Sequence, residues 1–529
     1  MDAISSKMAL VAIVLSVVLL CHIEFTSAEK PCAARTVPDR SVVCVCNETY
    51  CDEVQRHTPV PGTFVVYTTS EAGSRFKKLE GVLEDNNEKA AYTLTLDLGK
   101  FYQKIEGFGG AVTDAAAINW RNLSSPLQDH LINSYFSATG LEYNMMRVPI
   151  GGTDFSTRPY AYNELPVDDR LLSNYTLSDE DLNYKIPMIL RASSVATSKI
   201  QIVATTWSPP PWMKTNNDYR GFSQLQDKYY QTYALYHLKF LYQYASFGVP
   251  VWAITTTNEP MNGIIYPYVI NCLGWLPYNM GKWISQNLGP TIKGSPFNAT
   301  KILAMDDQRY NIPIMINLML HEHPSARQFV SGVAVHFYGD QYTPPAALSE
   351  LATTYPEMII LATEACEGSF PWNTLKVDIG SWKRAVSYIT DIITDLNHNV
   401  VGWMDWNLCL NAQGGPSWTS NFVDSPIIVF PEKKEFIKQP MFYAMGHFSK
   451  FVPRGSRRIK TEENKSFFSS MVQNVAFVTP RNTVVVVLYN DGKQKEMAIQ
   501  LGSKQASIIL EGNSISTVEL PIAFTHAKL

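Results

Sequence analysis

The stretch Met358-Ile359-Ile360-Leu361-Ala362-Thr363-Glu364 is an apolar run that ends abruptly in an acid. Earlier in the chain, Val251-Trp252-Ala253-Ile254-Thr255-Thr256-Thr257-Asn258-Glu259-Pro260 follows the same pattern. Runs this apolar are typical of strands that are buried on both faces, as in a parallel sheet. Because a following proline disfavours helical backbone, we expect the second strand to reach Glu259 in extended geometry.

The same pattern recurs through the middle of the chain. We predict further strands at 143–149, 200–206, 332–337 and 400–403, with helices at 229–245 and 381–396 between them. This alternation favours βα units around parallel strands. Besides the two glutamates, the residues at the strand ends are Arg147, Trp207, His336, Asp405 and Trp406. Chemistry sits at the carboxyl ends of the strands in a (β/α)8 barrel, and at least six recurrences of this strand-end pattern favour a barrel over an open sheet.

The two ends of the chain have a different texture. From about residue 32 to 98, and again from about 455, short β-like runs replace the alternation. The late runs lie at 472–479, 483–489, 507–510 and 514–520, and Asn490-Asp491-Gly492 predicts a hairpin turn between two of them. We therefore expect a second, β-type domain that both ends of the chain complete.

Composition and motifs exclude several classes of function. The net charge is -4 and no basic stripe is present, which disfavours a nucleic-acid partner. Gly107-Phe108-Gly109-Gly110-Ala111-Val112 lacks the third glycine of a dinucleotide loop, and His321-Glu322-His323 lacks the spacing of zinc ligands on a helix. Neither a Walker loop nor a Gly-x-Ser-x-Gly elbow occurs. We expect a protein without cofactor or metal.

The N-terminus predicts export. Lys7 precedes an apolar run from Met8 to Leu20, and the small residues Thr26-Ser27-Ala28 follow it. The run is too short for a comfortable membrane span and fits a signal peptide at 1–28, with an uncleaved anchor as the alternative. No later stretch is apolar enough to cross a bilayer. The candidate glycosylation sequons lie at Asn47, Asn122, Asn174, Asn298 and Asn464.

Cysteine usage agrees with export. Cys32, Cys44, Cys46 and Cys51 lie within twenty residues, which favours two disulfides that staple a short segment. Four cysteines allow three pairings, and the residues alone do not choose among them. A zinc site is the rival, although the cluster contains neither a histidine nor a C-x-x-C motif. The remaining cysteines of the exported chain, which we expect to be buried free thiols, are Cys272, Cys366 and Cys409.

Glu259 and Glu364 are the candidate catalytic pair. A single glutamate at a strand end is usually a loop charge or an ion-pair partner. Two of them at the mouth of one barrel match the proton donor and the ionised carboxylate that glycoside hydrolysis needs. Tryptophans follow two of the predicted strands, and with Asp405 and Asn407 they could line and hold a sugar.

Six motifs together make the chain resemble the glucosylceramidase family of acid β-glucosidases. One is Thr257-Asn258-Glu259-Pro260, which many barrel glycosidases share. The others lie at 107–115, 361–366, 402–408, 421–426 and 447–451. The likeness extends over nearly the whole exported chain, and the full set of motifs is specific.

The resemblance implies a fold. It implies a (β/α)8 TIM barrel with an immunoglobulin-like β-sandwich domain and a small disulfide-stapled antiparallel sheet. The implied boundaries are 29–56 plus 407–438 for the small sheet, 57–102 plus 455–529 for the β domain, and 103–406 plus 439–454 for the barrel. The implied disulfides are Cys32–Cys44 and Cys46–Cys51.

The resemblance also implies roles. Glu259 matches the acid/base and Glu364 the nucleophile of a retaining mechanism, which requires carboxyl groups roughly 5–5.5 Å apart. Arg147 and Tyr338 match residues that hold the nucleophile. The residues that match glucose contacts are Asp154, Trp207, Asn258, Trp406 and Asn421. The implied reaction is hydrolysis of glucosylceramide to glucose and ceramide.

The implied surroundings are those of a lipid-degrading enzyme. The substrate is a glycosphingolipid at a membrane surface, with a saposin-like activator and anionic lipid as possible partners. The lysosomal lumen is the expected location, and secretion is the alternative. Phe337, Thr153 and Glu367 depart from the vertebrate pattern of the family, so aglycone preference stays open. The alternative functions are a sister β-glycosidase for soluble β-glucosides or β-xylosides, and a silent carbohydrate- or lipid-binding protein.

Overall fold

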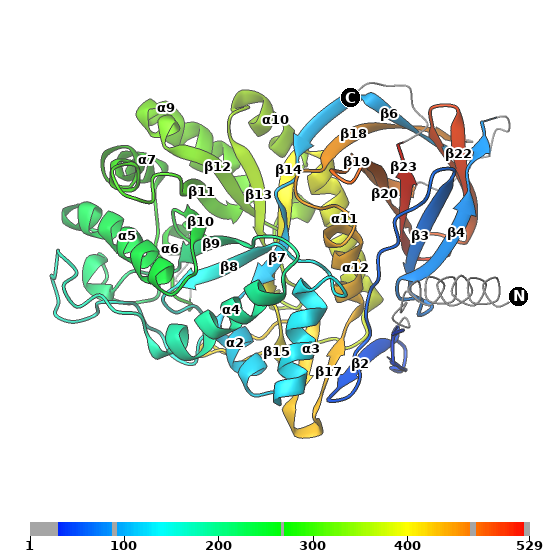
Figure 1. Ribbon diagram of the computed structural model, residues 1–529. Coiled ribbons are helices and arrows are strands. Elements are labelled where there is room, and N and C mark those ends of the chain that lie inside the picture. Colours follow the sequence, from blue (N-terminus) through cyan, green and yellow to red (C-terminus); the bar gives the residue numbers. More distant parts are fainter. Residues whose placement is uncertain (1–29, 87–91, 266–268, 466–471, 523–529) are drawn as a thin grey trace, which may run out of the picture.

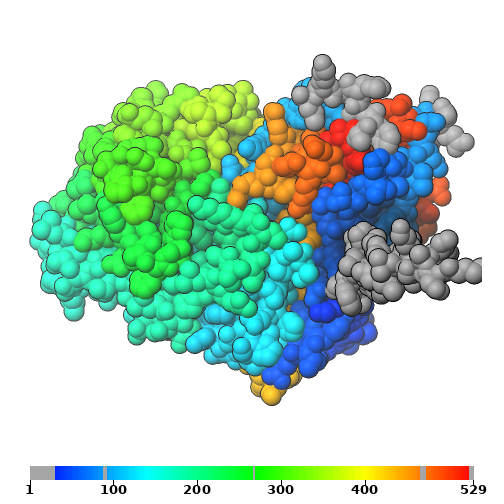
Figure 2. Space-filling view, in the orientation of Figure 1, coloured from blue at the N-terminus to red at the C-terminus, as the bar shows by residue number. Residues whose placement is uncertain are grey.

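A computed structural model describes residues 30–86, 92–265, 269–465 and 472–522 (Figure 1). The predicted signal peptide at 1–28 lies outside these residues. Within them, no helix has both the length and the apolar character needed to cross a bilayer. Figure 2 shows that the early chain (blue) and the C-terminal chain (orange and red) share one side of the molecule, beside the cyan and green surface of the barrel.

Eight parallel strands close into a barrel, as predicted. The strands are β7 (Gly107–Ala111), β8 (Met145–Ile150), β9 (Gln201–Thr206), β10 (Val251–Thr255), β11 (Lys301–Gln308), β12 (Val330–His336), β13 (Ile359–Glu364) and β14 (Val400–Asn407). Side chains from seven of these strands fill the barrel interior, among them Met145, Leu303 and Leu361. The barrel is thus a packed core whose chemistry is confined to its mouth.

Two of these strands, β7 and β11, were missing from the sequence-based prediction. The glycine-rich stretch that imitates a dinucleotide loop is strand β7. A Cβ atom on Gly109 would lie 1.9 Å from the carbonyl oxygen of Met145 on the neighbouring strand. The glycine therefore permits the close approach of the two strands.

Helices surround the barrel (Figure 1). Their buried apolar side chains belong to the same hydrophobic core as side chains of the barrel strands. The longer ones are α2 (Asp114–Arg121), α3 (Ser125–Phe136), α4 (Ile186–Val195), α5 (Tyr230–Ser246), α10 (Ala346–Thr354), α11 (Trp382–Asn397) and α12 (Pro440–Ser449). The shorter ones are α6 (Asn262–Ile265), α7 (Pro277–Trp283), α8 (Gly289–Lys293) and α9 (Met319–Glu322). The two helices predicted from periodicity are α5 and α11, each within one residue of its expected bounds.

Both ends of the chain build the β domain. Its strands are β3 (Thr63–Ser70), β4 (Lys77–Val82), β5 (Glu84–Asp85), β6 (Tyr92–Lys104), β18 (Arg457–Lys465), β19 (Val472–Val478), β20 (Thr483–Asn490), β21 (Lys495–Leu501), β22 (Lys504–Leu510) and β23 (Ser514–Pro521). They pair in the order β4-β3-β23-β20-β19-β18-β6-β21-β22-β5. Side chains of β3, β20 and β23 pack against those of β6, β21 and β22, as in a sandwich.

The hairpin expected at Asn490-Asp491-Gly492 does not form. β20 pairs with β19 and β23, whereas β21 pairs with β6 and β22. The turn therefore carries the chain from one part of the sheet to the other, and its residue types mark a turn without fixing which strands pair.

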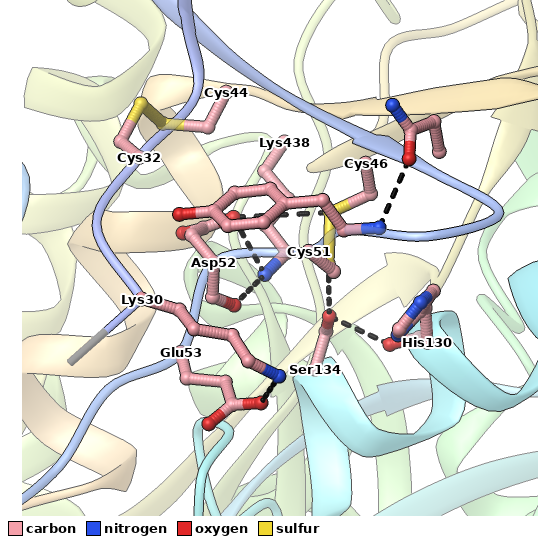
Figure 3. The surroundings of a disulfide bond; sticks show 12 residues. Lys30, Cys32, Cys44, Cys46, Cys51, Asp52, Glu53, His130, Ser134 and Lys438 are labelled. Atoms are coloured by element: carbon pink, nitrogen blue, oxygen red, sulfur yellow. Dashed lines mark hydrogen bonds and ion pairs between the residues drawn. A yellow bond between two sulfur atoms is a disulfide. The ribbon is translucent and has the colours of Figure 1, made fainter. Parts of the chain in front are cut away.

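A small sheet contains the disulfides (Figure 3). Its strands are β1 (Ala34–Arg35), β2 (Val43–Asn47), β15 (Leu410–Asn411), β16 (Ile427–Phe430) and β17 (Glu435–Lys438), in the order β1-β2-β17-β16-β15. The disulfides are Cys32–Cys44 and Cys46–Cys51, the pairing that the resemblance implies. The domain boundaries given above stay a prediction.

A buried ion pair ties this sheet together. The ammonium of Lys438 on β17 lies 3.0 Å from an Asp52 carboxylate oxygen and also donates to the Asp52 carbonyl at 2.9 Å. The hydroxyl of Tyr443 on α12 donates to the same carboxylate at 2.6 Å. Because a buried charge is costly unless it is paired, these contacts fix the stapled segment to β17 and α12.

Candidate active site

A pocket of about 820 Å³ opens at the carboxyl ends of the barrel strands. Both candidate glutamates lie in its wall. The other lining residues predicted from the sequence are Asp154, Trp207, Asn258, Tyr338, Trp406 and Asn421. Arg147 lies beneath the wall and is fully buried. The structure therefore brings all nine predicted site residues to one place.

Glu364 is the last residue of β13 and is held by two neighbours. The guanidinium of Arg147 on β8 donates to its Oε2. The hydroxyl of Tyr338, which follows β12, donates to its Oε1 at 2.7 Å. Burial raises the pKa of Glu364, and the charges of Arg147 and His336 oppose that rise. The carboxylate is thus oriented and charge-paired, as a nucleophile must be.

Glu259 does not have the extended geometry expected before Pro260. Strand β10 ends at Thr255, and Glu259 has a φ of 42°, in the left-handed region. Pro260 disfavours the right-handed helical region at this position, and the backbone takes the uncommon left-handed one instead. The N–H of Glu259 donates to the carbonyl of Asp306 at 2.9 Å, and this hydrogen bond fixes the turn.

Three side chains contact the carboxyl group of Glu259. Gln308 Nε2 donates to Oε1 at 2.9 Å, and Asn262 Nδ2 donates to Oε2 at 2.5 Å. Nδ1 of His336 lies 3.0 Å from Oε1. One oxygen of Glu259 and one of Glu364 lie within 4.8 Å of each other, and a nitrogen of His336 lies within 4.8 Å of both. Two carboxyl groups this close leave no room for the intervening water of an inverting enzyme.

Asp306 is a site residue that the sequence-based prediction missed. It lies on β11, and its carboxylate contacts Arg147 Nη2 at 2.8 Å and His336 Nε2 at 3.0 Å. Burial would raise its pKa, but the charges of Arg147 and His336 outweigh burial and hold the pKa well below its ordinary value. The signal was available, since Lys301–Gln308 is another apolar run that ends in polar residues.

A bulge in β11 places three consecutive polar residues at the site. Pairing with β12 shifts between Met305 and Asp307, and Met305 and Asp306 have φ values of 76° and 58°. Bulges next to active sites redirect side chains. Asp306 consequently points beneath the pocket, whereas Asp307 and Gln308 line it. Burial, together with the charge of Glu259, raises the pKa of Asp307 to about 7.

Two tryptophans form an aromatic wall. Trp207 and Trp406 stack with ring centroids 5.2 Å apart and an interplanar angle of 23°. The guanidinium carbon of Arg147 lies 4.7 Å from the Trp207 ring centroid and 5.4 Å from that of Trp406. Arg147, which donates to Glu364, therefore also makes cation–π contacts with both rings.

Asp154 and Asn421 face each other across the pocket wall. Asn421 Nδ2 donates to Asp154 Oδ2 at 2.8 Å. Burial raises the pKa of Asp154 to about 7, with the charge of Glu364 adding to the effect and Asn421 opposing it. Asn258 accepts from Arg147 Nη2 at 2.6 Å. Buried carboxyl and amide groups of this kind suit the hydroxyl groups of a sugar.

Asp405 and Asn407, expected to hold sugar hydroxyls, face away from the pocket. The Asp405 carboxylate accepts from the hydroxyl of Tyr388 on α11, outside the barrel. Asn407 Oδ1 accepts from Thr113 Oγ1 at 2.6 Å. Side chains alternate along a strand, so Trp406 points into the mouth while its two neighbours cannot.

Among the described residues, the side-chain hydrogen bonds of Glu259 and Glu364 involve none of the three departures from the family pattern. Phe337 packs edge-on against Tyr338, Tyr388 and Trp403. Glu367 lines a separate, neighbouring cavity of about 610 Å³. The third departure, Thr153, is buried, and its Oγ1 accepts from the N–H of Phe155 at 2.9 Å.

Three groups of side chains in the described part of the chain offer ligand atoms within metal-binding range. They are Cys46, Cys51 and Asp52; Glu259, His336 and Glu364; and Asp340, Asp391 and Asp395. In the first group the sulfur atoms form a disulfide. In the second, both His336 nitrogens face carboxylates and Arg147 holds Glu364. In the third, Arg309 pairs with two of the carboxyl groups. The disulfide and the ion pairs thus occupy ligand atoms of the first two groups, whereas Arg309 only partly compensates the third.

Family comparisons agree with this geometry. The model described as "Glycosyl hydrolase family 30 TIM-barrel domain" matches residues 105–452, well over half of the chain. The chain belongs to glycosyl hydrolase family 30. A second model, "Glycosyl hydrolase family 30 beta sandwich domain", matches residues 455–518. The family 30 protein is a glycoside hydrolase, and enzymes of this family are retaining glycosidases.

Similar proteins extend the comparison. The lysosomal acid glucosylceramidase of Mus musculus is 43% identical over 467 residues, covering 87% of this chain and 89% of the mouse protein. Putative glucosylceramidase 3 of Caenorhabditis elegans is 40% identical over 483 residues, covering 89% and 92%. These relatives confirm the resemblance to glucosylceramidases.

Solved structures show the same fold. The crystal structure of SrfJ from Salmonella typhimurium has a TM-score of 0.79 at 23% identity and covers 87% of this chain and 99% of its own. An endo-β1,6-glucanase structure has a TM-score of 0.76 at 24% identity and covers the same shares. At these identities the likeness concerns the fold.

Proposed function

We propose that this chain hydrolyses glucosylceramide to glucose and ceramide by a double displacement, with Glu364 as nucleophile and Glu259 as acid/base. The observation that supports this most directly is the pair of glutamate oxygens within 4.8 Å of each other. Retaining enzymes need this short spacing because one carboxylate attacks the sugar directly.

The first step forms a glycosyl-enzyme. An ionised oxygen of Glu364 bonds to the anomeric carbon while the bond to the ceramide oxygen breaks and that oxygen takes the proton of Glu259. In the second step Glu259 accepts a proton from water, and the water oxygen displaces Glu364 from the sugar. Glucose leaves, and both carboxyl groups return to their starting states.

The pocket mouth supports a lipid aglycone. Five apolar side chains line the outer part of the pocket: Ile265, Val269, Tyr310, Tyr342 and Phe370. Phe370 is half-buried, and the other four are roughly half or more exposed. Exposed apolar side chains around a pocket are typical of sites that bind apolar ligands or surfaces. We infer that the sugar enters the polar base of the pocket and that the ceramide lies against this mouth.

An acidic compartment suits the site. The raised pKa values of Asp154 and Asp307, both about 7, keep these carboxyls protonated at acidic pH. Above pH 7 both would ionise and add negative charge beside the glutamates. All five sequon asparagines are exposed, which supports glycosylation on the secretory route. We propose the lysosomal lumen as the location, with anionic lipid and a saposin-like activator as partners.

The test compares three substrates at mildly acidic pH in vesicles that contain anionic lipid. Glucosylceramide is expected to be cleaved, and galactosylceramide and a soluble β-xyloside much more slowly. Glu364→Gln should lower kcat by at least about a thousandfold, because it removes the nucleophile. The matched control is Glu367→Gln, three residues further along and outside the pocket, which should keep wild-type activity.

Other outcomes identify the alternatives. Cleavage of the soluble glycosides alone would show a sister β-glycosidase. No turnover of any substrate, with the protein folded, would favour a carbohydrate- or lipid-binding protein.

A further inference from the structure

Asp306 occupies a central position that substrate contact does not explain. It is fully buried and does not line the pocket. Its oxygens accept from three threonine hydroxyls: Thr205 at 3.1 Å and Thr255 at 2.8 Å on Oδ2, and Thr363 at 2.5 Å on Oδ1. A buried carboxylate with this many donors is fixed in orientation and ionised.

Each oxygen of Asp306 leads to one member of the catalytic pair. Oδ2 accepts from Nη2 of Arg147 at 2.8 Å, and Nη1 of the same guanidinium donates to Glu364. Oδ1 lies 3.0 Å from Nε2 of His336, and Nδ1 of that ring lies 3.0 Å from Glu259. We propose that Asp306 is a positioning residue shared by both catalytic glutamates, acting on Glu364 through Arg147 and on Glu259 through His336.

This role deepens the proposed function and rests on it for its catalytic meaning. With Glu259 protonated for the first step, the cations Arg147 and His336 balance the anions Asp306 and Glu364. Neutralising Asp306 removes one anion from this balance. For both His336 nitrogens to donate, one to Asp306 and one to Glu259, the ring must remain an imidazolium.

The groups around His336 come from several elements. Asp306 and Asp307 face it from β11, Glu364 from β13, Arg147 from β8 and Glu259 from the turn after β10; Tyr338 lies beside the ring. Burial lowers the pKa of His336, but the charge of Glu364 and the contacts with Asp306 and Glu259 raise it to about 10. Loss of the Asp306 charge should bring this pKa down toward the ordinary histidine value of about 6.5.

The main test is Asp306→Asn. An amide has one acceptor and one donor end, so it cannot accept from both Arg147 and His336. We expect kcat on an aryl β-glucoside to fall about a hundredfold, as for misplaced catalytic groups, with KM changed less than about threefold because Asp306 does not contact substrate. The alkaline limb of the kcat profile should move to lower pH.

Asp114→Asn is the matched control. Asp114 on α2 is equally buried, pairs with Lys185 at 3.3 Å and accepts from Ser156 Oγ at 2.6 Å, outside the pocket. Its replacement should lower the melting temperature without moving the pH profile of the folded enzyme. A purely structural role for Asp306 predicts the same behaviour for both variants, and that result would overturn the proposal.

If Asp306→Asn does not fold, two threonine variants test the two connections of Asp306 separately, one to Glu259 through His336 and one to Glu364 through Arg147. Thr363→Val removes a donor on the His336 side, and Thr255→Val removes one on the Arg147 side. An activated leaving group needs little acid catalysis. The Thr363→Val defect in glycosylation, measured as kcat/KM, should therefore shrink on a dinitrophenyl glucoside, whereas the Thr255→Val defect should persist. Equal defects on both substrates would contradict this arrangement of two connections.

A titration that needs no substrate separates this proposal from the proposed function. The ¹⁵N NMR signal of His336, assigned by its loss in His336→Asn, should show a protonated ring at pH 8 in the wild type. In Asp306→Asn the ring should titrate at lower pH, because the carboxylate that stabilises the imidazolium is gone. An unchanged titration would overturn the proposal even if glucosides are cleaved. A shifted titration supports it even if glucosylceramide is not the substrate.

Discussion

Two groups of acidic side chains lie near the barrel mouth and differ in how their charge is compensated. In the first, which we call the Asp306 network, Asp306 contacts both Arg147 and His336. In the second, the Asp340 cluster, one oxygen each of Asp340, Asp391 and Asp395 lies within 4.8 Å of the others. There Arg309 lies 3.2 Å from Asp340 and 3.4 Å from Asp395.

The pKa values of Asp306 and Asp340 are shifted in opposite directions. The pKa of Asp306 lies well below its ordinary value, because two cations outweigh burial. The pKa of Asp340 is raised to about 11, first by burial and then by the charges of Asp391 and Asp395, which Arg309 only partly offsets. Burial raises the pKa of both Asp306 and Asp340, so the supply of cations and donors decides which carboxyl groups ionise.

The largest expected effect comes from removing a cation from the Asp306 network. Arg147→Gln leaves Asp306 and Glu364 buried without their guanidinium. Breaking a buried pair in this way costs roughly 3–5 kcal/mol of unfolding free energy. Chemical denaturation at pH 7 measures it.

The matched control for that loss is Arg158→Gln, which breaks an ion pair with Glu180 whose arginine is half exposed. That change should cost less than about 1 kcal/mol. Equal losses in the two variants would show that the buried network carries no special charge balance.

Replacing an aspartate of the Asp340 cluster is expected to change the unfolding free energy by a smaller amount and to stabilise the protein. Burial and the charge of Asp391 raise the pKa of Asp395 well above its ordinary value. A carboxyl with a raised pKa binds its proton more tightly in the folded state, so its stabilising contribution is complete below the unfolded pKa of about 4 and is lost as pH rises. Asp395→Asn should therefore raise the unfolding free energy at pH 7 by about 1 kcal/mol and change little near pH 4.

Thermal unfolding from pH 4 to pH 8 measures this gain. Asp129→Asn is the control, because Asp129 pairs with Arg191 at the surface, with both side chains more than 40% exposed. It should show no gain at pH 7. Destabilisation by Asp395→Asn at pH 7 would mean that the cluster is fully ionised and compensated, like the Asp306 network.

Sequence patterns predicted the barrel and the meeting of Glu259 and Glu364 at its mouth, because both depend on local signals. Apolar runs that end in polar residues identified six of the eight strands, and the motifs around Glu259 and Glu364 identified the glutamates. Strand β7 was missed because its glycines, needed for close approach to β8, remove the apolar pattern.

Other features depend on contacts between distant segments. Asp306 acquires its importance from Arg147 and His336, which come from other strands. The left-handed backbone at Glu259 depends on a hydrogen bond to β11, and propensity before proline does not reveal it. Asp405 points out of the barrel because side chains alternate along β14, and the sequence-based prediction did not take this alternation into account.

The most direct test of the account traps the sugar on the enzyme. A 2-deoxy-2-fluoro β-glucoside with an activated leaving group slows release of the glycosyl-enzyme, and peptide mass spectrometry locates the label. We predict one fluoroglucosyl group per chain, attached to Glu364, and no label in Glu364→Gln. A label on Glu259 or another residue, or turnover without a covalent intermediate, would contradict the assignment of Glu364 as the nucleophile.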